Sequence, residues 1–262
     1  YKHVDLGAYV DRLREEAPHP AAKVGVVVAQ GSIVDGEQPA GVIGGDTVAS
    51  LIRQAREDDA IKAVVLRVDS PGGSATASEV IRRELELTRQ AGQTVVVSMG
   101  SVAASGGYWI SMAADEVWAS PTTITGSIGI FAMLPDLSGP MDKLGLTVDG
   151  IGTTPLSGGL DLRRPVDPQV ANVLQQTIEY GYRRFLAVVG TARKMSPEAV
   201  DDVAQGRVWL GSQAKEKGLV DKLGGLDAAL KSAAARAGLT DYDVVYVEKP
   251  MSPRDQLLAR LL

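Results

Sequence analysis

The chain has 262 residues, 45% of them apolar, and a formal net charge of −5 at pH 7. This length and apolar content suffice for one large α/β domain, and the acidic balance lacks the clustered basic face of a nucleic-acid-binding protein, so no nucleic-acid partner is expected. Because the chain has no cysteine, disulfide frameworks and thiolate catalysis are excluded. No run reaches the roughly 18 to 20 apolar residues that a membrane-spanning helix needs.

Strands and helices are predicted to alternate along the first half of the chain. Continuous β-branched runs such as KVGVVVAQGSI are typical of strands covered on both faces, and apolar residues at helical spacing mark the helices between them. In chain order we predict a lead-in helix and linker at 1–22, a strand at 23–33, a helix capped by Asp46 or Thr47, a strand at 63–70, a helix at 75–91, a strand at 93–100, a helix at 106–115 and a strand at 116–120. This alternation predicts an α/β fold with a parallel sheet.

The second half of the chain follows a different pattern. Residues 153–168, TTPLSGGLDLRRPVDP, are rich in glycine and proline and are predicted to form a flexible loop. From about residue 167 the chain is predicted to be mostly helical, until a late strand in YDVVYVEK at 242–249.

Ser105 is the first candidate for chemistry. It stands in the motif AASGG, after the strand at 93–100 and where the next helix is predicted to start. A hydroxyl there lies near unpaired backbone N–H groups and the positive end of the helix dipole, which together can stabilise an oxyanion. The two following glycines allow a substrate backbone to come close. A helix cap explains the same serine without any chemistry.

A second glycine turn strengthens the chemical interpretation. The motif DSPGG at 69–73 ends one predicted parallel strand, and AASGG follows the next one along the chain. Both turns are therefore expected at the carboxyl edge of the sheet, where open α/β folds place their sites. We predict that the backbone amides of Gly73 and Gly106 converge on one carbonyl oxygen. Taken alone, DSPGG is also explained as an ordinary turn.

The sequence offers few groups that could take a proton from Ser105. His3 and His19 precede the first predicted core strand, where they are expected to be exposed to solvent. No paired spacing of metal ligands is visible, so neither a metal nor another cofactor is predicted. The remaining option is a lysine kept neutral by burial, as in Ser/Lys variants of the catalytic triad. The lysines expected to be exposed beside turns or on charged helix faces are Lys62, Lys143, Lys215, Lys217 and Lys222.

Several ordered motifs resemble one protein family. They are LRVDSPGGSA, SMGSVAASGGYWISMAADEVWASPTTITGSIGI, DKLGL and GRVWLGSQAKEKGLVDKLGG. Over about residues 23–235 the chain resembles the signal peptide peptidase A family, bacterial membrane-anchored serine proteases of the Clp protease and crotonase fold. The resemblance implies repeated ββα units with a parallel sheet in a peptidase domain at 23–240 with a helical carboxyl-terminal region, followed by a strand and tail at 241–262. It also implies cleavage of signal peptides left in the membrane after secretion.

The resemblance also assigns roles to individual residues. Ser105 matches the family's nucleophile, and Gly73 and Gly106 match the glycines whose amides form the oxyanion hole. Ser127, in the motif TGSIG, matches the serine that hydrogen-bonds the general-base lysine. A serine that merely fills a tight turn is the alternative interpretation of Ser127.

The base lysine itself is missing from the expected place. Short members of the family supply it from the loop after the strand that follows DKLGL, but here that loop, GIGTTPLSGGLDLRRP, has no lysine. Arg163 and Arg164 cannot replace it, because a guanidinium does not deprotonate. Long members carry two copies of the fold, with the serine in the carboxyl-terminal copy and the lysine in the other. This chain begins at Tyr1 and resembles that carboxyl-terminal copy, so we expect an amino-terminal half of the same precursor or a neighbouring subunit to complete the site.

Partners and location also follow from the resemblance. The family forms ring-like oligomers with apolar grooves, which implies a homo-oligomeric ring such as a tetramer, on the periplasmic side of the bacterial inner membrane with the anchor outside this chain. An apolar signal peptide is expected to bind as an added strand, with side chains in alternate pockets. Candidate groove residues, for each of which core packing is the alternative, are Met99, Val102, Ile128, Phe131 and Met133.

Two other classes of function stay open on the sequence. A crotonase-like acyl-CoA enzyme would use the same two amides to hold a thioester enolate, but it would need a carboxylate near AASGG rather than Ser105. A non-catalytic scaffold of the same fold would explain the missing lysine, although it gives no reason for Ser105, Ser127 and both glycine turns to be present.

Overall fold

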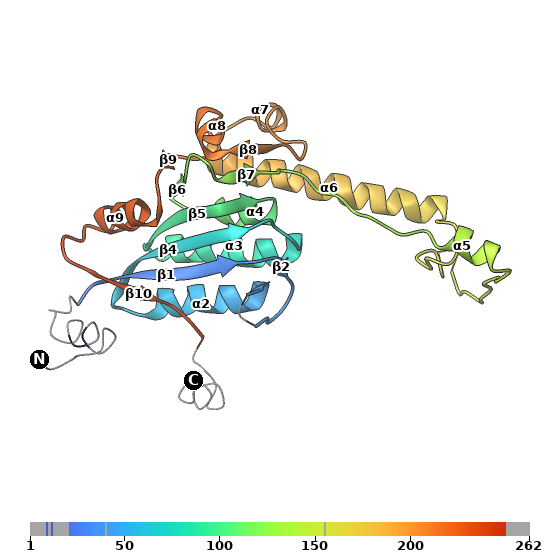
Figure 1. Ribbon diagram of the computed structural model, residues 1–262, viewed down its shortest axis with the longest axis horizontal. Helices are drawn as coiled ribbons and strands as arrows, with labels where there is room; N and C mark the ends of the chain where they lie inside the picture. The colour runs from blue at the N-terminus through green and yellow to red at the C-terminus, as the bar shows by residue number, and fades with distance from the viewer. Residues whose placement is uncertain (1–8, 10–11, 13–20, 40, 155, 250–262) are drawn as a thin grey trace, which may run out of the picture.

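A mostly parallel sheet forms the centre of the protein (Figure 1). The computed structural model describes residues 9, 12, 21–39, 41–154 and 156–249, so nearly all of the lead-in at 1–22 and the tail after Lys249 fall outside it. The main strand order is β10 (Asp243–Tyr246), β1 (Lys23–Gln30), β4 (Ile61–Ser70), β5 (Thr94–Ala104), β6 (Glu116–Ala119) and β9 (Lys222–Leu223). Every pair along this order is parallel, which confirms the predicted α/β class.

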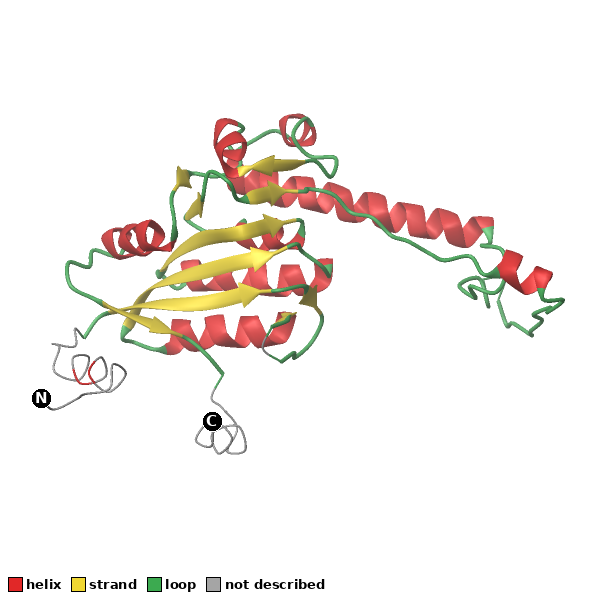
Figure 2. Cartoon of the chain, viewed as in Figure 1, coloured by secondary structure: helices red, strands yellow, loops and turns green. Residues whose placement is uncertain are grey.

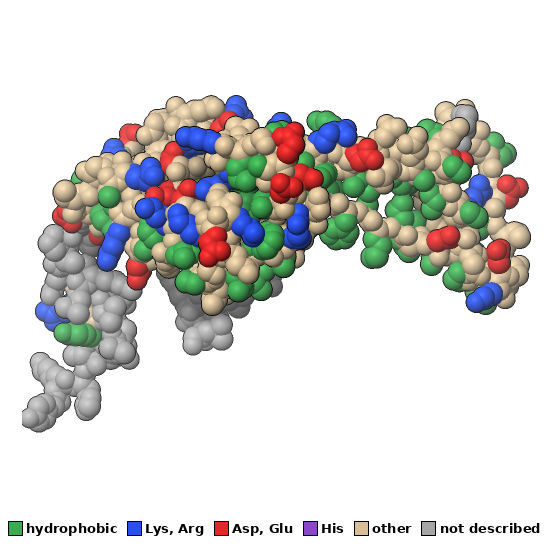
Figure 3. Space-filling model, turned by 90° about the horizontal axis from the view of Figure 1, so that it is seen from above, with side chains coloured by type: hydrophobic (Ala, Val, Ile, Leu, Met, Phe, Trp, Pro, Cys, Tyr) green, Lys and Arg blue, Asp and Glu red, His purple; other side chains and the backbone are tan. Residues whose placement is uncertain are grey.

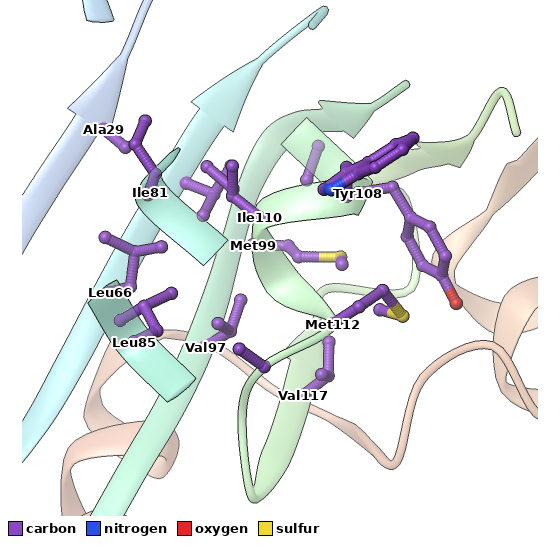
Figure 4. Packing of buried hydrophobic residues seen from close by; sticks show 14 of the residues in the cluster. Ala29, Leu66, Ile81, Leu85, Val97, Met99, Tyr108, Ile110, Met112 and Val117 are labelled. Carbon is purple, nitrogen blue, oxygen red and sulfur yellow. The ribbon is translucent and has the colours of Figure 1, made fainter. Parts of the chain in front are cut away.

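Helices cover both faces of the sheet because its central strands are apolar on both sides (Figure 2). On one face α2 (Gly45–Glu57), α3 (Ala75–Gln90) and α4 (Gly106–Ser111) pack on the larger core cluster. Leu66 of β4 and Ile81 of α3 have no exposed surface in this cluster (Figure 4). On the other face, small residues of α9 (Leu226–Arg236) pack against the valines of the first strands.

Several bounds and one cap of the predicted elements were wrong. The first strand ends at Gln30 rather than at residue 33, and the helix predicted at 106–115 ends at Ser111. Helix α2 begins after Gly44, and neither Asp46 nor Thr47 caps it. The hydroxyl of Thr47 instead accepts the backbone N–H of Gln38 at 2.9 Å, so a loop contact uses the group that a cap would need. Strand β5 continues four residues beyond the predicted end at residue 100, to Ala104, because β7 (Ile124–Gly126) pairs with its last residues.

An arm projects from the body of the molecule (Figure 1). The chain leaves the body at Ile130, beside Gly181, passes through α5 (Ser138–Lys143) at the tip and returns along α6 (Pro168–Arg193). Helix α6 has 26 residues and is therefore about 39 Å long. Between α5 and α6 the described residues form turns without a helix or strand, in agreement with the predicted loop at 153–168.

The surface of the arm is rich in exposed apolar side chains (Figure 3). They are Phe131, Met133, Leu134, Leu137, Leu144, Leu146, Ile151, Leu156, Leu160, Val166, Val173 and Tyr180. Monomeric proteins rarely leave so large an apolar surface open to water. In the described part of the chain, no helix has both the length and the apolar run needed to span a bilayer.

From about residue 167 to Lys249 the chain is mostly helical, as predicted, with α6 contributing most of the helix, and the part after α6 also holds two short strands that were not predicted. Helix α7 (Pro197–Asp201) is followed by β8 (Val208–Leu210), α8 (Gly211–Glu216) and β9. Strand β8 pairs antiparallel with β7 and so lies beside the carboxyl end of β5. The late strand β10 pairs with β1 and is the edge strand of the same sheet.

Candidate active site

Three sequence motifs meet at the carboxyl edge of the sheet. The ladder between β4 and β5 pairs Ser70 with Ala103, and the ladder between β5 and β7 pairs Ala104 with Gly126. DSPGG, AASGG and TGSIG each begin within one of these strands and continue past its end. The fold therefore gathers residues that are more than fifty positions apart in the sequence into one place.

Ser105 occupies a strained turn between β5 and α4. Its φ and ψ are 52° and −118°, and although it stands at the N-cap position of α4, its side chain makes no capping hydrogen bond, so capping does not explain the hydroxyl. Backbone hydrogen bonds hold the turn instead. The N–H of Ser105 donates to the carbonyl oxygen of Gly126 at 2.9 Å, and the carbonyl of Ser105 accepts the N–H of Trp109 at 2.9 Å. A non-glycine residue with such a backbone costs roughly 1 to 3 kcal/mol and persists only where its surroundings impose it.

Helix α4 is short but firmly anchored, which fixes the position of Ser105. The hydroxyl of Tyr108 donates to the carbonyl of Leu219 at 2.7 Å, and the indole of Trp109 donates to Glu79 at 2.8 Å. Burial raises the pKa of Tyr108, so this phenol keeps its proton and remains a donor. Side chains on the buried face of α4 thus hold the start of the helix in place.

Glycines allow the DSPGG turn to lie directly against Ser105. A Cβ on Gly72 would lie 2.7 Å from the amide nitrogen of Gly106 and 2.8 Å from Cβ of Ser105. A Cβ on Gly106 would lie 3.2 Å from the amide nitrogen of Gly73. Within the described residues, neither the Gly73 nor the Gly106 N–H has a hydrogen-bond acceptor. Two unused donors therefore lie close together at the turn of Ser105.

Ser127 lies at the end of β7, beside the turn of Ser105. Its φ is 49°, and its N–H donates to the carbonyl of Arg207 at 2.8 Å. Four described non-glycine residues have positive φ, namely Ser105, Ser127, Lys194 and Gln205. Both predicted serines belong to this small group, and neither hydroxyl has a hydrogen-bond partner among the described residues.

Lys215 and Lys217 make contacts that lead away from these two serines. Lys215 donates to the carbonyl of Asp221 at 2.6 Å, and the ammonium of Lys217 lies 4.1 Å from the centre of the Trp209 ring. No lysine in the described ranges donates to Ser105 or Ser127. The lysine-free loop at 153–168 lies at the tip of the arm, whereas β7 lies at its base (Figure 1). The same ranges contain no group of three or more metal-ligating side chains.

The structure divides the predicted groove residues into two sets. Val102 is half-buried, and Phe131 and Met133 are 88% and 85% exposed at the start of the arm. Met99 and Ile128 are fully buried in the core, so the prediction that they line a groove is wrong (Figure 4 shows Met99). Both belong to segments whose apolar runs are equally typical of core and of groove, and only packing distinguishes them.

The residues that hold the Ser127 turn were not predicted from the sequence. The backbone of Gly126 pairs with Val208, and the N–H of Gly206 donates to the oxygen of Ile128 at 2.9 Å. The short run RVWL between two glycines was the available signal for β8, but three to four residues are too few for a periodic pattern.

Comparisons with known proteins find several similar proteases. Protease 4 of Salmonella typhi is 46% identical over 251 residues, covering 96% of this chain and 40% of the relative. Protease 4 of Haemophilus influenzae is 45% identical over 232 residues, covering 88% of this chain and 38% of the relative. The chain thus spans about two fifths of the length of these curated relatives. The chloroplastic serine protease SPPA of Arabidopsis thaliana is 34% identical over 222 residues, covering 83% of this chain and 33% of the relative.

Two solved structures share the fold at low sequence identity. A ClpP1 mutant from Listeria monocytogenes has a TM-score of 0.51 at 15% identity, covering 78% of this chain and 94% of that one. A mutant of the membrane-bound stomatin-specific protease 1510-N has a TM-score of 0.53 at 16% identity, covering 87% of this chain and 99% of that one. These likenesses confirm the expected Clp protease-like fold. Residues 88–240 match Peptidase family S49, and the chain belongs to that family.

Proposed function

We propose that this chain carries the nucleophile and the oxyanion hole of a serine peptidase that degrades signal peptides remaining in the membrane after secretion. Its family is a peptidase family. The observation that carries the proposal is the free hydroxyl of Ser105, in a strained turn beside the unused amides of Gly73 and Gly106. The test is hydrolysis of an apolar peptide by the complete protein with Ser105 present or replaced by alanine.

The proposed reaction is acyl transfer through a Ser/Lys pair. The Ser105 oxygen attacks the scissile carbonyl carbon while its proton passes to a neutral lysine amine. The carbonyl oxygen becomes an oxyanion that accepts the N–H groups of Gly73 and Gly106. When the tetrahedral species collapses, the C–N bond breaks and the lysine ammonium gives its proton to the leaving amine. Water then hydrolyses the Ser105 ester by the same route.

The base lysine is proposed to come from outside these residues. The long form of the family has an amino-terminal half that fits this role, and the chain's coverage of about two fifths of its relatives is compatible with a half of that form. A neighbouring subunit is the other source. The arm tip lies far from the Ser105 turn of its own chain, but its loop at 153–168 has no lysine, so a second copy of this chain cannot supply the base from that loop (Figure 1).

Assembly into a ring, such as a tetramer, is part of this proposal. The arm exposes apolar side chains along its length, and a neighbouring subunit would remove them from water (Figure 3). We place the assembled protein at the periplasmic face of the bacterial inner membrane. There, an extended apolar substrate would pass Val102, Phe131 and Met133 on its way to Ser105.

A non-catalytic scaffold is the second candidate function. The absence of lysine from residues 153–168 favours it. The free hydroxyls and the strained backbones of Ser105 and Ser127 favour catalysis, since a scaffold would have no use for either.

Ser127→Ala is expected to lower kcat by roughly 10- to 1000-fold and to leave KM little changed. The physical reason is that the Ser127 hydroxyl is proposed to orient the lysine amine for proton transfer. The measurement is steady-state hydrolysis by the complete protein, with Ser50→Ala, an exposed serine on α2, as the control. A change confined to KM would instead assign Ser127 to substrate binding.

Gly106→Ala is expected to lower kcat by roughly 100-fold, because one oxyanion donor would be displaced. The new Cβ would lie 2.6 Å from Oγ of Ser78 and 3.2 Å from the amide nitrogen of Gly73, so one of these groups must move. Gly225→Ala is the matched control, since a Cβ there meets nothing within 4 Å. Unchanged turnover in a folded Gly106→Ala protein would remove Gly106 from the proposed oxyanion hole.

A further inference from the structure

The turn of Ser127 is held from outside by a neighbouring strand. The carbonyl of Arg207 accepts the Ser127 N–H at 2.8 Å, and the N–H of Gly206 donates to the carbonyl of Ile128 at 2.9 Å. These two bonds flank Ser127 and fix its left-handed backbone. The position of the Ser127 hydroxyl therefore depends on residues that lie some eighty positions later in the chain.

The holding segment is itself strained. Gln205 and Gly206 have φ values of 58° and 74°, so two consecutive left-handed residues precede Arg207. Gln205 is exposed, so burial does not impose its conformation. A non-glycine residue in this region needs specific contacts to stay there.

Tyr182 supplies those contacts from the base of the arm helix. Its hydroxyl accepts the backbone N–H of Gln205 at 3.1 Å and donates to the carboxylate of Asp201. The same carboxylate accepts the side-chain amide of Gln205 at 3.0 Å. Burial and the bond to Asp201 raise the pKa of Tyr182, and the bond from Tyr182 lowers the pKa of Asp201. The phenol thus keeps its proton and the carboxylate its charge, which suits a donor and acceptor pair.

We propose that Tyr182 is a positioning residue for Ser127, acting through Asp201 and the strained Gln205. This inference rests on the proposed role of Ser127 in orienting the base. Without the phenol hydroxyl, the Gln205 N–H loses its acceptor and the left-handed pair can relax. The carbonyl of Arg207 then shifts, and the Ser127 hydroxyl moves away from the lysine that it orients. Because Tyr182 belongs to α6, its side chain couples the position of the arm helix to the geometry of the site.

The experiment compares Tyr182→Phe with Tyr246→Phe in the complete protein. Tyr246 is 52% exposed on β10, which β1 and β4 separate from β5, so it controls for loss of a phenol hydroxyl away from the site. Tyr182→Phe is expected to lower kcat about tenfold with KM unchanged, a size typical of one displaced hydrogen bond, while Tyr246→Phe keeps the wild-type kcat. All assays are run well below the thermal midpoint of each variant, so that only folded protein is compared.

Placing Tyr182→Phe in a Ser127→Ala background separates positioning from a purely structural role. If Tyr182 acts through Ser127, its removal has no further effect on kcat once the Ser127 hydroxyl is gone. Asp201→Asn is expected to keep most of the activity because it retains an acceptor, whereas Asp201→Ala behaves like Tyr182→Phe.

Two results would overturn the inference. They are a wild-type kcat in folded Tyr182→Phe, or an equal tenfold loss in both backgrounds. A wild-type kcat in Ser127→Ala alone would instead remove the proposed role of Ser127 itself, so failure of that role is distinguishable from failure of the positioning by Tyr182.

Discussion

Replacing Ser105 by alanine is expected to abolish peptide hydrolysis by the complete protein and to leave the fold intact. Loss of a nucleophile of this kind lowers kcat by about 10⁴- to 10⁶-fold, because only the oxyanion hole and substrate binding still contribute to catalysis. The fold is expected to survive because the Ser105 side chain makes no capping hydrogen bond. A surface substitution without such a contact changes stability by about 0.5 kcal/mol or less.

The measurement pairs hydrolysis of an apolar fluorogenic peptide with the thermal midpoint. Ser101→Ala is the matched control, since Ser101 is an exposed serine on the same strand, four residues before the turn. Wild-type turnover in Ser105→Ala would exclude Ser105 as the nucleophile. A fall of several degrees in the midpoint would show that the hydroxyl contributes to folding, in spite of having no partner within the described chain.

The second large effect concerns the chain by itself. Residues 1–262 alone are expected to fold and to hydrolyse peptides very slowly or not at all. A serine hydroxyl without a base is too weakly acidic to attack at neutral pH, and an oxyanion hole alone leaves only residual catalysis, about 10³ to 10⁴ over water. Adding the amino-terminal half of the long form is expected to restore turnover.

The pH dependence of the restored activity identifies the base. Burial lowers the pKa of a lysine, and only its neutral amine can accept the Ser105 proton. The rate is therefore expected to rise with pH through that lowered pKa and then to level off. Replacing the groove lysine of the added half by alanine removes the rise.

Full activity of the isolated chain, in a preparation free of other proteases, would contradict the split site. Lys143 and Lys194 would then be the next bases to replace. No activity after reconstitution, with Ser105 accessible and the assembly formed, would favour the scaffold function.

Local patterns predicted many elements of the fold, because each depends on a short stretch of chain. The helix predicted at 75–91 is observed at Ala75–Gln90, and the buried strands β1 and β4 lie where β-branched runs predicted them. The error at Asp46 and Thr47 arose because a loop nine residues away uses the Thr47 hydroxyl. Short strands such as β8 escaped prediction since pairing with β7, rather than their own pattern, makes them strands.

What the sequence by itself determined is the class of the fold, the family and the two serines and two glycines on which the chemistry is proposed to depend. These follow from local motifs and their order, which are properties of the chain alone. Only the tertiary structure decided that the Ser105 side chain is not a cap, that Met99 and Ile128 belong to the core, and that apolar residues such as Phe131 and Met133 are exposed on an arm. It also brought Tyr182 and Gln205 to the turn of Ser127. The physical reason is that burial, strained backbone and hydrogen bonding between distant strands depend on which segments contact one another in the folded protein. Residue spacing and composition do not specify those contacts.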